Sequence, residues 1–300
     1  MEKIGNTMEK LGKLNRVDSD QLIERILADP EVAAFITSQG LNQDEITLSL
    51  SKFNQFLLER QKYQTGDHSY IAKGYAPILV MNEGYADVSY QETKELVEAK
   101  KKAAISDRIN LVNLPKSYRN INMTDIDVNN ASRMQALSKI LDFVEQYPNV
   151  SQKGLYLYGD MGIGKSYFMA AMARELSERK GVSTTLLHFP TFTIDVKNAI
   201  SSGSVKDEID AIKNVPVLIL DDIGAEQATS WVRDEVLQVI LQYRMLEELP
   251  TFFTSNYSLT DLERKWANIK GNDETWQAKR VMERVRYLAQ EFHLEGANRR

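Results

Sequence analysis

The sequence predicts an α/β fold, in which helices flank a parallel sheet, preceded by a small, mainly helical domain with a β-hairpin. Three observations support this prediction. From residue 154 onward, short apolar runs alternate with amphipathic segments, as expected for parallel strands joined by crossover helices. A glycine-rich, phosphate-binding pattern follows the first of these runs, and two aspartates end the third.

The composition is that of a globular protein with no dominant charge. The 300 residues favour two domains, and the net charge of −5 provides no general attraction to nucleic acid. The absence of cysteine excludes disulfides and thiolate metal sites. No apolar run approaches the roughly 18 residues of a membrane span, and the first residues lack a signal-peptide pattern. We therefore expect a cytoplasmic protein that does not associate with membranes.

Three helices are expected within residues 18–60. The first ends at Asp29-Pro30, the second ends before Gly40, and the third begins after Asn42, because these residue types cap or stop helices. Apolar residues at helical spacing predict that the helices pack together, with docking of a partner as the alternative. These residues are Leu22, Ile23, Ile26, Val32, Phe35, Ile36, Ile46, Leu48, Leu50, Phe53, Phe56 and Leu57.

A β-hairpin is expected next, with strands at 76–81 and 85–90 that flank an Asn-Glu-Gly turn. A charged helix follows at about 92–105. Its cluster Lys100-Lys101-Lys102 is expected to form a solvated helix face, with nucleic-acid contact as the alternative.

Residues 111–128 contain Pro115 and several Asn, Ser and Asp residues, a composition typical of a linker. This linker separates an N-terminal domain at 1–110 from a C-terminal domain at 129–300. The C-terminal domain opens with a helix whose apolar face is expected at Met134, Leu137, Leu141 and Val144. Strands are expected at 154–158, 182–189, 215–220, 251–255 and 292–294, with helices between them.

Residues 159–166 read Gly-Asp-Met-Gly-Ile-Gly-Lys-Ser, the pattern of a phosphate-binding loop. Glycines let the backbone curl so that successive N–H groups converge on a polyphosphate, and the following helix directs its N-terminus at the same anion. Lys165 is expected to contact the β- and γ-phosphates, and Ser166 to place its hydroxyl on Mg²⁺. The expected nucleotide-binding residues are Gly159, Asp160, Met161, Gly162, Ile163, Gly164, Lys165, Ser166 and Tyr167.

Polar residues follow two later apolar strands. Asp221 and Asp222 end the strand at 215–220, and Asn256 ends the strand at 251–255. Because the carboxyl ends of parallel strands meet at one edge of a sheet, we expect these side chains beside the phosphate loop. Asp221 is expected to hold Mg²⁺, Asp222 to polarise the attacking water as a general base or hydrogen-bond acceptor, and Asn256 to orient that water. A turn or helix cap is the alternative for the two aspartates, and a turn is the alternative for Asn256.

These motifs, together with late arginines at 280 and 284, resemble the AAA+ ATPases. Within them the chain resembles the bacterial helicase loaders of the DnaC/DnaI type, which are similar to the transposon-associated IstB ATPases. The resemblance is specific in the C-terminal domain and lies in the arrangement of elements in the N-terminal region. The segments that most resemble loaders of this type are 153–159, 229–236, 249–256 and 295–300.

The resemblance implies an ATPase that uses Mg²⁺ and associates with itself. Asn256 matches the sensor-1 residue, and Arg284 matches the arginine that such loaders offer to a neighbouring subunit's nucleotide. Arg300 or Arg299 is the candidate for the second sensor arginine, which also contacts nucleotide. A solvated helix face is the alternative for Arg280, Arg284 and Arg286.

The resemblance also implies that the N-terminal domain binds a replicative, DnaB-type hexameric helicase. Relatives carry a cysteine-rich zinc site there, whereas the corresponding segment here, 64–70, contains one histidine, His68, and no cysteine. We therefore expect no zinc, and His188 is expected to pack at a strand end. The side chains expected to pack in place of the metal are Tyr75, Ile78, Val80, Tyr85 and Tyr90.

The function expected from this combination is delivery of the helicase onto single-stranded DNA. Trp231 and Arg233 are candidate DNA contacts, because a stacking aromatic beside a cation suits single strands. A place in the core is the alternative for Trp231. Two other functions stay open: an IstB-like ATPase for transposition, and a nucleotide-gated adaptor with little turnover.

Overall fold

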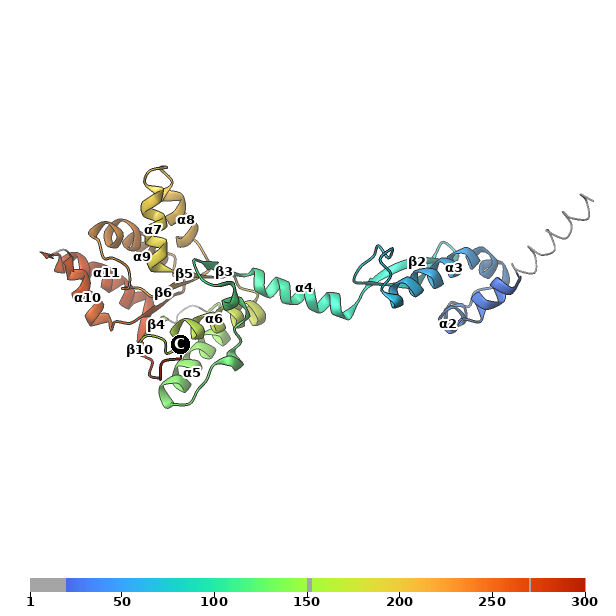
Figure 1. Cartoon of the computed structure of the whole chain (residues 1–300), viewed down its shortest axis with the longest axis horizontal. Helices are drawn as coiled ribbons and strands as arrows, with labels where there is room; N and C mark the ends of the chain where they lie inside the picture. Colours follow the sequence, from blue (N-terminus) through green and yellow to red (C-terminus); the bar gives the residue numbers. More distant parts are fainter. Residues whose placement is uncertain (1–19, 150–152, 270, 300) are drawn as a thin grey trace, which may run out of the picture. The chain divides into compact units, whose positions relative to one another are not determined.

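The computed structural model describes residues 20–149, 153–269 and 271–299 (Figure 1). The chain divides into two compact units, Met1–Lys101 and Lys102–Arg300. The boundary falls inside the helix α4 (Lys94–Asp107), earlier than the predicted domain end at residue 110. Each unit has its own hydrophobic core, so the two are described separately.

The first unit contains the predicted helices and hairpin. Asp29 caps α2 by accepting hydrogen bonds from two backbone N–H groups, and Asn42 forms a capping box with Glu45 at the start of α3. Gly40 ends α2 in the left-handed conformation. The elements are α2 (Pro30–Gln39), α3 (Gln43–Thr65), β1 (Tyr75–Asn82) and β2 (Tyr85–Glu92).

One face of the hairpin packs on the helices. Leu79 and Val88 are directly opposite each other in the register, and both pack against a core of helix residues and Ala86. The predicted packing residues Ile78 and Val80 lie outside this core. Because side chains alternate between the two faces of a strand, Ile78 and Val80 lie on the other face of the hairpin, and the prediction was one residue out of phase for these two.

An aromatic cluster forms around Tyr70, in the segment 64–70 that corresponds to the zinc site of the relatives. Tyr70 is buried, its hydroxyl donates to the Tyr75 carbonyl (2.8 Å), and its ring contacts those of Tyr63 and Tyr90. The loop after α3 is therefore held to the hairpin by aromatic packing and a hydrogen bond. Of the residues expected to replace the metal, Tyr90 takes part in this cluster through its ring.

The second unit contains a six-stranded parallel sheet with the order β10-β4-β7-β6-β5-β3. The edge strand β3 crosses the predicted boundary between the N-terminal domain at 1–110 and the linker at 111–128. Ile109 at its start is fully buried in the core of the second unit, so residues 109–112 form part of the sheet. The strands are β3 (Ile109–Val112), β4 (Gly154–Tyr158), β5 (Thr184–His188), β6 (Val217–Asp221), β7 (Thr251–Ser255) and β10 (Ala289–His293).

Helices cover both faces of this sheet (Figure 1). One face carries α5 (Ala131–Gln146) and α6 (Lys165–Glu175). The other face carries α7 (Phe189–Ala199), α8 (Val205–Lys213), α9 (Gln238–Leu246), α10 (Leu259–Ala267) and α11 (Thr275–Leu288). The arrangement confirms the predicted α/β class, although α10 and the small β8–β9 hairpin at 268–273 were not predicted.

The buried face of α5 agrees with the predicted one at Val144, which is fully buried, and at Leu137, which packs on the core. It differs at the start of the helix, where Met134 is 59% exposed and Arg133 and Ala136 are buried. The prediction counted only apolar residues, and the buried stripe of this helix begins with an arginine.

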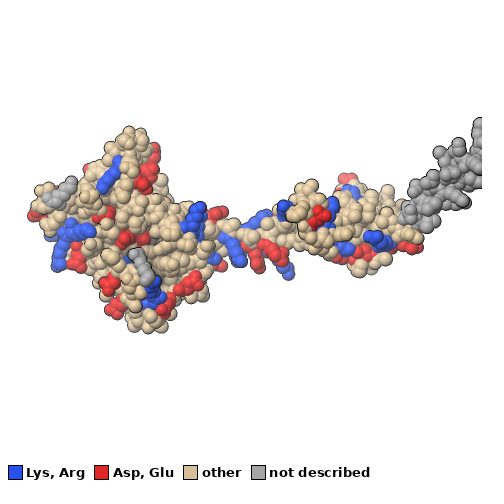
Figure 2. Space-filling model, viewed as in Figure 1, with Lys and Arg blue, Asp and Glu red and all other residues tan. Residues whose placement is uncertain are grey.

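None of the helices in the described part of the chain is long and apolar enough to cross a bilayer. Figure 2 shows cations and acids interspersed on the visible face of this unit.

Ser49 links α3 to the hairpin, and its loss should loosen the first unit. Its fully buried hydroxyl donates to the Glu45 carbonyl (2.7 Å) and accepts from the Ala86 N–H (2.8 Å). Ser49→Ala leaves that N–H buried and unpaired, at a cost of about 1–3 kcal/mol. We expect faster hydrogen exchange in α3 and β2 of the full chain. The exposed Ser51→Ala is the control, and equal exchange in both variants would contradict this role.

Candidate nucleotide-binding site

The carboxyl ends of β4, β6 and β7 open into a cavity of about 690 Å³, called here the nucleotide cavity. Its walls come from the phosphate loop, from the two strand ends with acidic or amide residues, and from the segment after β3. The lining residues are Asn113, Leu114, Pro115, Tyr118, Asp125, Ile126, Asp127, Arg133, Met161, Gly162, Gly164, Lys165, Ser166, Tyr167, His188, Thr191, Asp221, Asp222, Ala225, Thr254, Asn256 and Arg299.

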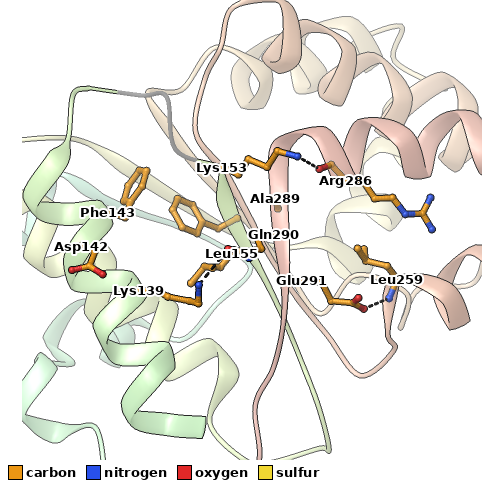
Figure 3. A pocket seen from close by; sticks show the side chains of 11 residues that line it. Lys139, Asp142, Phe143, Lys153, Leu155, Leu259, Arg286, Ala289, Gln290 and Glu291 are labelled. Carbon is orange, nitrogen blue, oxygen red and sulfur yellow. Dashed lines mark hydrogen bonds between the residues drawn. The ribbon is translucent and has the colours of Figure 1, made fainter. Parts of the chain in front are cut away.

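A second cavity, of about 600 Å³, lies beside the edge strand β10 (Figure 3). Its cations are already engaged: Lys139 donates to Gln290, Lys153 donates to the Arg286 carbonyl, and the Arg286 side chain pairs with Glu263. It lacks a loop of converging backbone N–H groups. The nucleotide cavity is therefore the better phosphate site.

The phosphate loop connects β4 to α6 through glycines that no other residue could replace without strain. Gly159 and Gly162 have φ values of 151° and 78°, and a Cβ on either would lie 2.3 Å from the chain's last segment. Lys165 begins α6 and is only 7% exposed. Its ammonium donates to the carbonyls of Gly159 and Asp160 (2.9 and 2.8 Å) and to Asn256 Oδ1 (2.8 Å).

Asp221 accepts hydrogen bonds from two hydroxyls on neighbouring elements. Ser166 Oγ lies 2.7 Å and Thr254 Oγ1 2.6 Å from the same carboxylate oxygen. Burial raises the pKa of Asp221 above its ordinary value, and the two hydrogen bonds oppose that rise. Ser166 and Asp221, the two residues predicted to hold Mg²⁺, thus lie in direct contact and present oxygen atoms, which suit this ion.

Asp222 and Asn256 form a second polar link across the cavity. Asn256 Nδ2 donates to Asp222 Oδ1 (3.2 Å), while Asn256 Oδ1 accepts from Lys165. Asp222 has φ 60°, a left-handed conformation that is costly for a residue with a Cβ, and its N–H donates to Thr254 Oγ1 (2.9 Å). The strained backbone aims the carboxylate at the cavity, where Lys165, Asn256 and Asp222 lie in a row.

Of the remaining loop residues, some are buried beneath the loop and others are exposed at the edge of the cavity. Ile163 is buried in the core under the loop, whereas Met161 is 67% exposed. Tyr167, half exposed, packs edge-to-face on Tyr118 (5.5 Å between ring centres). Tyr118 and its neighbours lie in the predicted linker, so sequence reasoning missed this wall of the cavity.

The late arginines occupy two different places. Arg284 on α11 donates to Gln242 Oε1 (2.7 Å) and to the Arg280 carbonyl (2.6 Å), and it is not among the described residues that line the nucleotide cavity. Burial and the nearby Arg280 lower the pKa of Arg284. Arg299 does line the cavity, and its side chain pairs with Asp127. Arg300, the other second-sensor candidate, lies outside the described residues.

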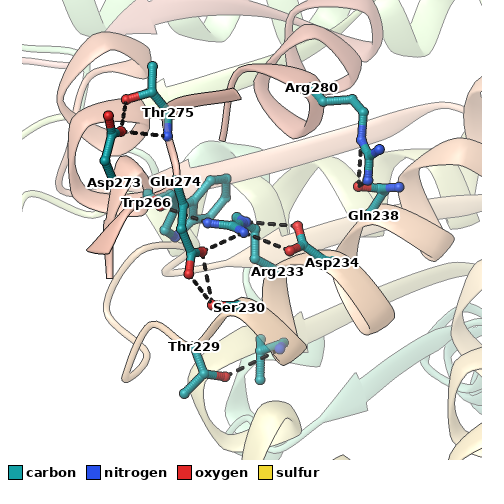
Figure 4. A network of polar contacts seen from close by, with 11 residues as sticks. Thr229, Ser230, Arg233, Asp234, Gln238, Trp266, Asp273, Glu274, Thr275 and Arg280 are labelled. Atoms are coloured by element: carbon teal, nitrogen blue, oxygen red, sulfur yellow. Dashed lines mark hydrogen bonds and ion pairs between the residues drawn. The ribbon is translucent and has the colours of Figure 1, made fainter. Parts of the chain in front are cut away.

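Arg233, a predicted DNA contact, belongs to a buried network (Figure 4). It is 2% exposed, pairs with Asp234 and Glu274, and donates to the Trp266 carbonyl (2.8 Å). The network links the start of the helix after residue 230 to the segment before α11. In this structure the Arg233 guanidinium is engaged within the protein, and half-buried Trp231 packs against the core.

Two further residues of the cavity were missed because their types gave no signal. Thr254 bridges the two aspartates, but a threonine in a strand is common. Arg133 directly precedes Met134, the first residue of the predicted apolar face of α5.

His188, predicted to pack at a strand end, lies at the end of β5 with Nδ1 2.8 Å from Thr191 Oγ1. Within the described ranges, no group of three or more His, Asp or Glu side chains is placed to hold a metal.

Comparisons with known proteins match both parts of the chain. Residues 79–300 match the family described as IstB-like ATP binding protein, and residues 1–90 match the primosomal protein DnaI N-terminus. The whole chain is 34% identical to the replicative helicase loader DnaI of Bacillus subtilis (strain 168), covering 99% of that protein.

Solved structures agree with these matches. A candidate primosome component from Streptococcus pyogenes serotype M3 is 78% identical, with a TM-score of 0.58 over 66% of this chain and 98% of its own. The DnaC helicase loader is 26% identical, with a TM-score of 0.52 over 60% of this chain and 100% of its own. The parallel sheet with helices on both faces is thus of the AAA+ type.

The buried charge of Asp221 should lower the stability of the chain. A folded-state pKa raised by burial means that the ionised carboxylate destabilises the fold above that pKa and ceases to do so below the ordinary value of 3.8. Asp221→Asn should therefore raise Tm at neutral pH, with a gain that shrinks as the pH falls. The same variant should weaken Mg²⁺ binding about 10- to 100-fold. Asp142→Asn, on the exposed side of α5, is the control. A gain in Tm that is the same at neutral and acidic pH would contradict a destabilising buried charge at Asp221.

Proposed function

The chain belongs to the DnaI family of replicative helicase loaders, and from this premise we propose that it delivers a DnaB-type hexameric helicase onto single-stranded DNA in the cytoplasm. The observation that carries the proposal is the combination, in one chain, of a DnaI-type N-terminal part and a nucleotide cavity. Its first 90 residues match the DnaI N-terminus, and its second unit holds a phosphate loop beside Asp221, Asp222 and Asn256. ATP binding would then switch the loader on and off the helicase.

The cavity supports ATP hydrolysis through residues that are already in position. The backbone of 159–166 and Lys165 would bind the phosphates, and Ser166 with Asp221 would hold Mg²⁺, which neutralises phosphate charge when bound. Asp222, aimed at the cavity by its strained backbone, would accept the proton of the attacking water. Asn256 would hold the side chains of Asp222 and Lys165 in position through its two hydrogen bonds.

Self-association would complete this site. Arg284 does not line the cavity of its own chain, and it lies on the opposite face of the sheet from α5 and α6. An arginine supplied by a neighbouring copy would stabilise the transition state, so hydrolysis would require oligomers. For DNA, Trp231 stays a candidate contact, and Arg233 would contribute only if its buried ion pairs opened.

One alternative has a specific observation in its favour. The IstB-like match over 79–300 also fits an ATPase for transposition. The DnaI match over 1–90 favours the loader, because the whole chain, with both units, is 34% identical to the helicase loader DnaI of Bacillus subtilis. The first unit is accordingly proposed to bind the helicase.

The loader proposal predicts a complex between the full chain and a DnaB-type helicase. We expect co-elution in size-exclusion chromatography, with a stability that differs between ATP and ADP. Lys165→Ala should remove the nucleotide dependence, because the phosphates lose their cation. Failure to form any complex, with either nucleotide or with none, would refute the loader function. Equal, near-zero ATPase rates for wild type and Lys165→Ala, even with helicase and single-stranded DNA present, would favour the adaptor instead.

A shared site predicts that two inactive variants rescue each other. Lys165→Ala and Arg284→Ala should each lose ATPase activity, by about 10³-fold or more for the arginine. Mixed, they form interfaces with an intact loop on one copy and an intact arginine on the other, so part of the activity should return. The matched control is Arg286→Ala, since Arg286 lies on the same helix but pairs with Glu263 of its own chain. No rescue in the mixture would count against a shared site.

A further inference from the structure

Arg133 is a buried cation in the wall of the nucleotide cavity. It lies in the first turn of α5, is 2% exposed, and appears in no motif of the sequence. Its Nε donates to the Asp127 carbonyl and its Nη1 to the Ile163 carbonyl (2.7 Å). Since Ile163 belongs to the phosphate loop, the arginine braces that loop from the side of α5.

The charge of Arg133 has no carboxylate partner in the described part of the chain. The nearest acid, Asp127, uses its carboxylate for Arg299 and offers Arg133 only its backbone oxygen. The guanidinium lies over the Phe168 ring, 5.0 Å from its centre. A buried charge that lacks a counter-ion is costly, so the site is electrostatically incomplete as the protein alone provides it.

One nitrogen of Arg133 faces the phosphate loop. Nη2 makes no hydrogen bond to a described residue, and it lies 3.8 Å from where a Cβ on Gly164 would stand. Gly164 immediately precedes Lys165, and Arg133, Gly164 and Lys165 all line the nucleotide cavity, so this donor lies beside the segment of the loop that leads into Lys165. Burial lowers the pKa of Arg133, and the charge of Arg299 lowers it further; a bound anion would oppose both effects.

Arg244 shows that burial by itself does not make a site. It too is fully buried and pairs with no carboxylate among the described residues, and burial lowers its pKa to about 9. All three of its nitrogens, however, donate to described residues of the strand and helix ends, and it does not line the nucleotide cavity. The acceptors are Thr251 Oγ1 and the carbonyls of Lys213, Val215 and Pro250. Arg133 differs by the free donor and by its position.

We propose that Arg133 is a positioning residue for the phosphate loop and that its charge is balanced by the phosphates of the bound nucleotide. It thus provides a second protein cation, beside Lys165, on the α5 side of the loop. Guanidinium groups pair well with phosphate, so the interaction selects for phosphorylated ligands over the nucleoside. This inference rests on the proposed binding of ATP to the nucleotide cavity.

The test separates charge from hydrogen bonding in the full chain. Arg133→Gln keeps a donor for the Ile163 carbonyl and removes the charge, whereas Arg133→Lys keeps the charge. By calorimetry, Arg133→Gln should bind ATP and ADP about 10- to 100-fold more weakly than wild type. Arg133→Lys should lose less affinity for ATP and ADP. Adenosine, which has no phosphate, should bind wild type and both variants with equal affinity.

Controls distinguish the possible failures. Arg244→Lys should lower Tm and leave ATP affinity unchanged. If the Gln and Lys variants lose ATP and adenosine affinity together, Arg133 has only a structural role and the proposal is overturned. If both variants bind ATP as wild type does, the phosphate interaction is absent. If wild type itself binds no nucleotide, the proposed function fails and not this inference alone.

Discussion

The carboxylate of Asp221 holds three elements of the second unit together. It accepts the Ser166 hydroxyl from the start of α6 and the Thr254 hydroxyl from β7, while it stands at the end of β6. Each of these contacts requires the order of strands in the sheet, since β6 and β7 must be neighbours with their carboxyl ends together. The strand order thus brings the proposed Mg²⁺ ligands together, and the two hydroxyls partly compensate the cost of burying the carboxylate.

The phosphate loop is supported by both sequence ends of its unit. The segment after β3 lines the cavity through Tyr118, and the last described residues of the chain lie against the loop. Leu294 N–H donates to the Tyr158 carbonyl (2.8 Å), and Arg299 N–H donates to the Gly162 carbonyl (3.0 Å). Arg133 joins these supports, because its guanidinium also lies 3.3 Å from where a Cβ on Gly296 would stand. The loop therefore depends on residues far from its motif.

Much of this arrangement could be predicted from the sequence because it follows local rules. Glycine spacing, apolar strands that end in acids, and helix caps act over a few residues, so the helix limits at Asp29, Gly40 and Asn42 were confirmed. The errors concern faces and long-range pairing. Nothing local distinguishes the side of the hairpin that carries Leu79 from the side that carries Ile78, and no local pattern adds β3 to a sheet whose other strands begin after residue 150.

Arginine is where sequence reasoning was least informative, and the reason is physical. Arg133, Arg233 and Arg244 are all buried, yet one borders the nucleotide cavity, one closes an ion-pair network and one binds backbone carbonyls. A guanidinium offers five donors on a long side chain, so its surroundings and not its position in a motif decide what it does. For Arg233 those surroundings neutralise the charge within the protein. For Arg133 they leave one donor and the charge directed at the phosphate loop, which is why burial there has a functional meaning that it lacks at Arg244.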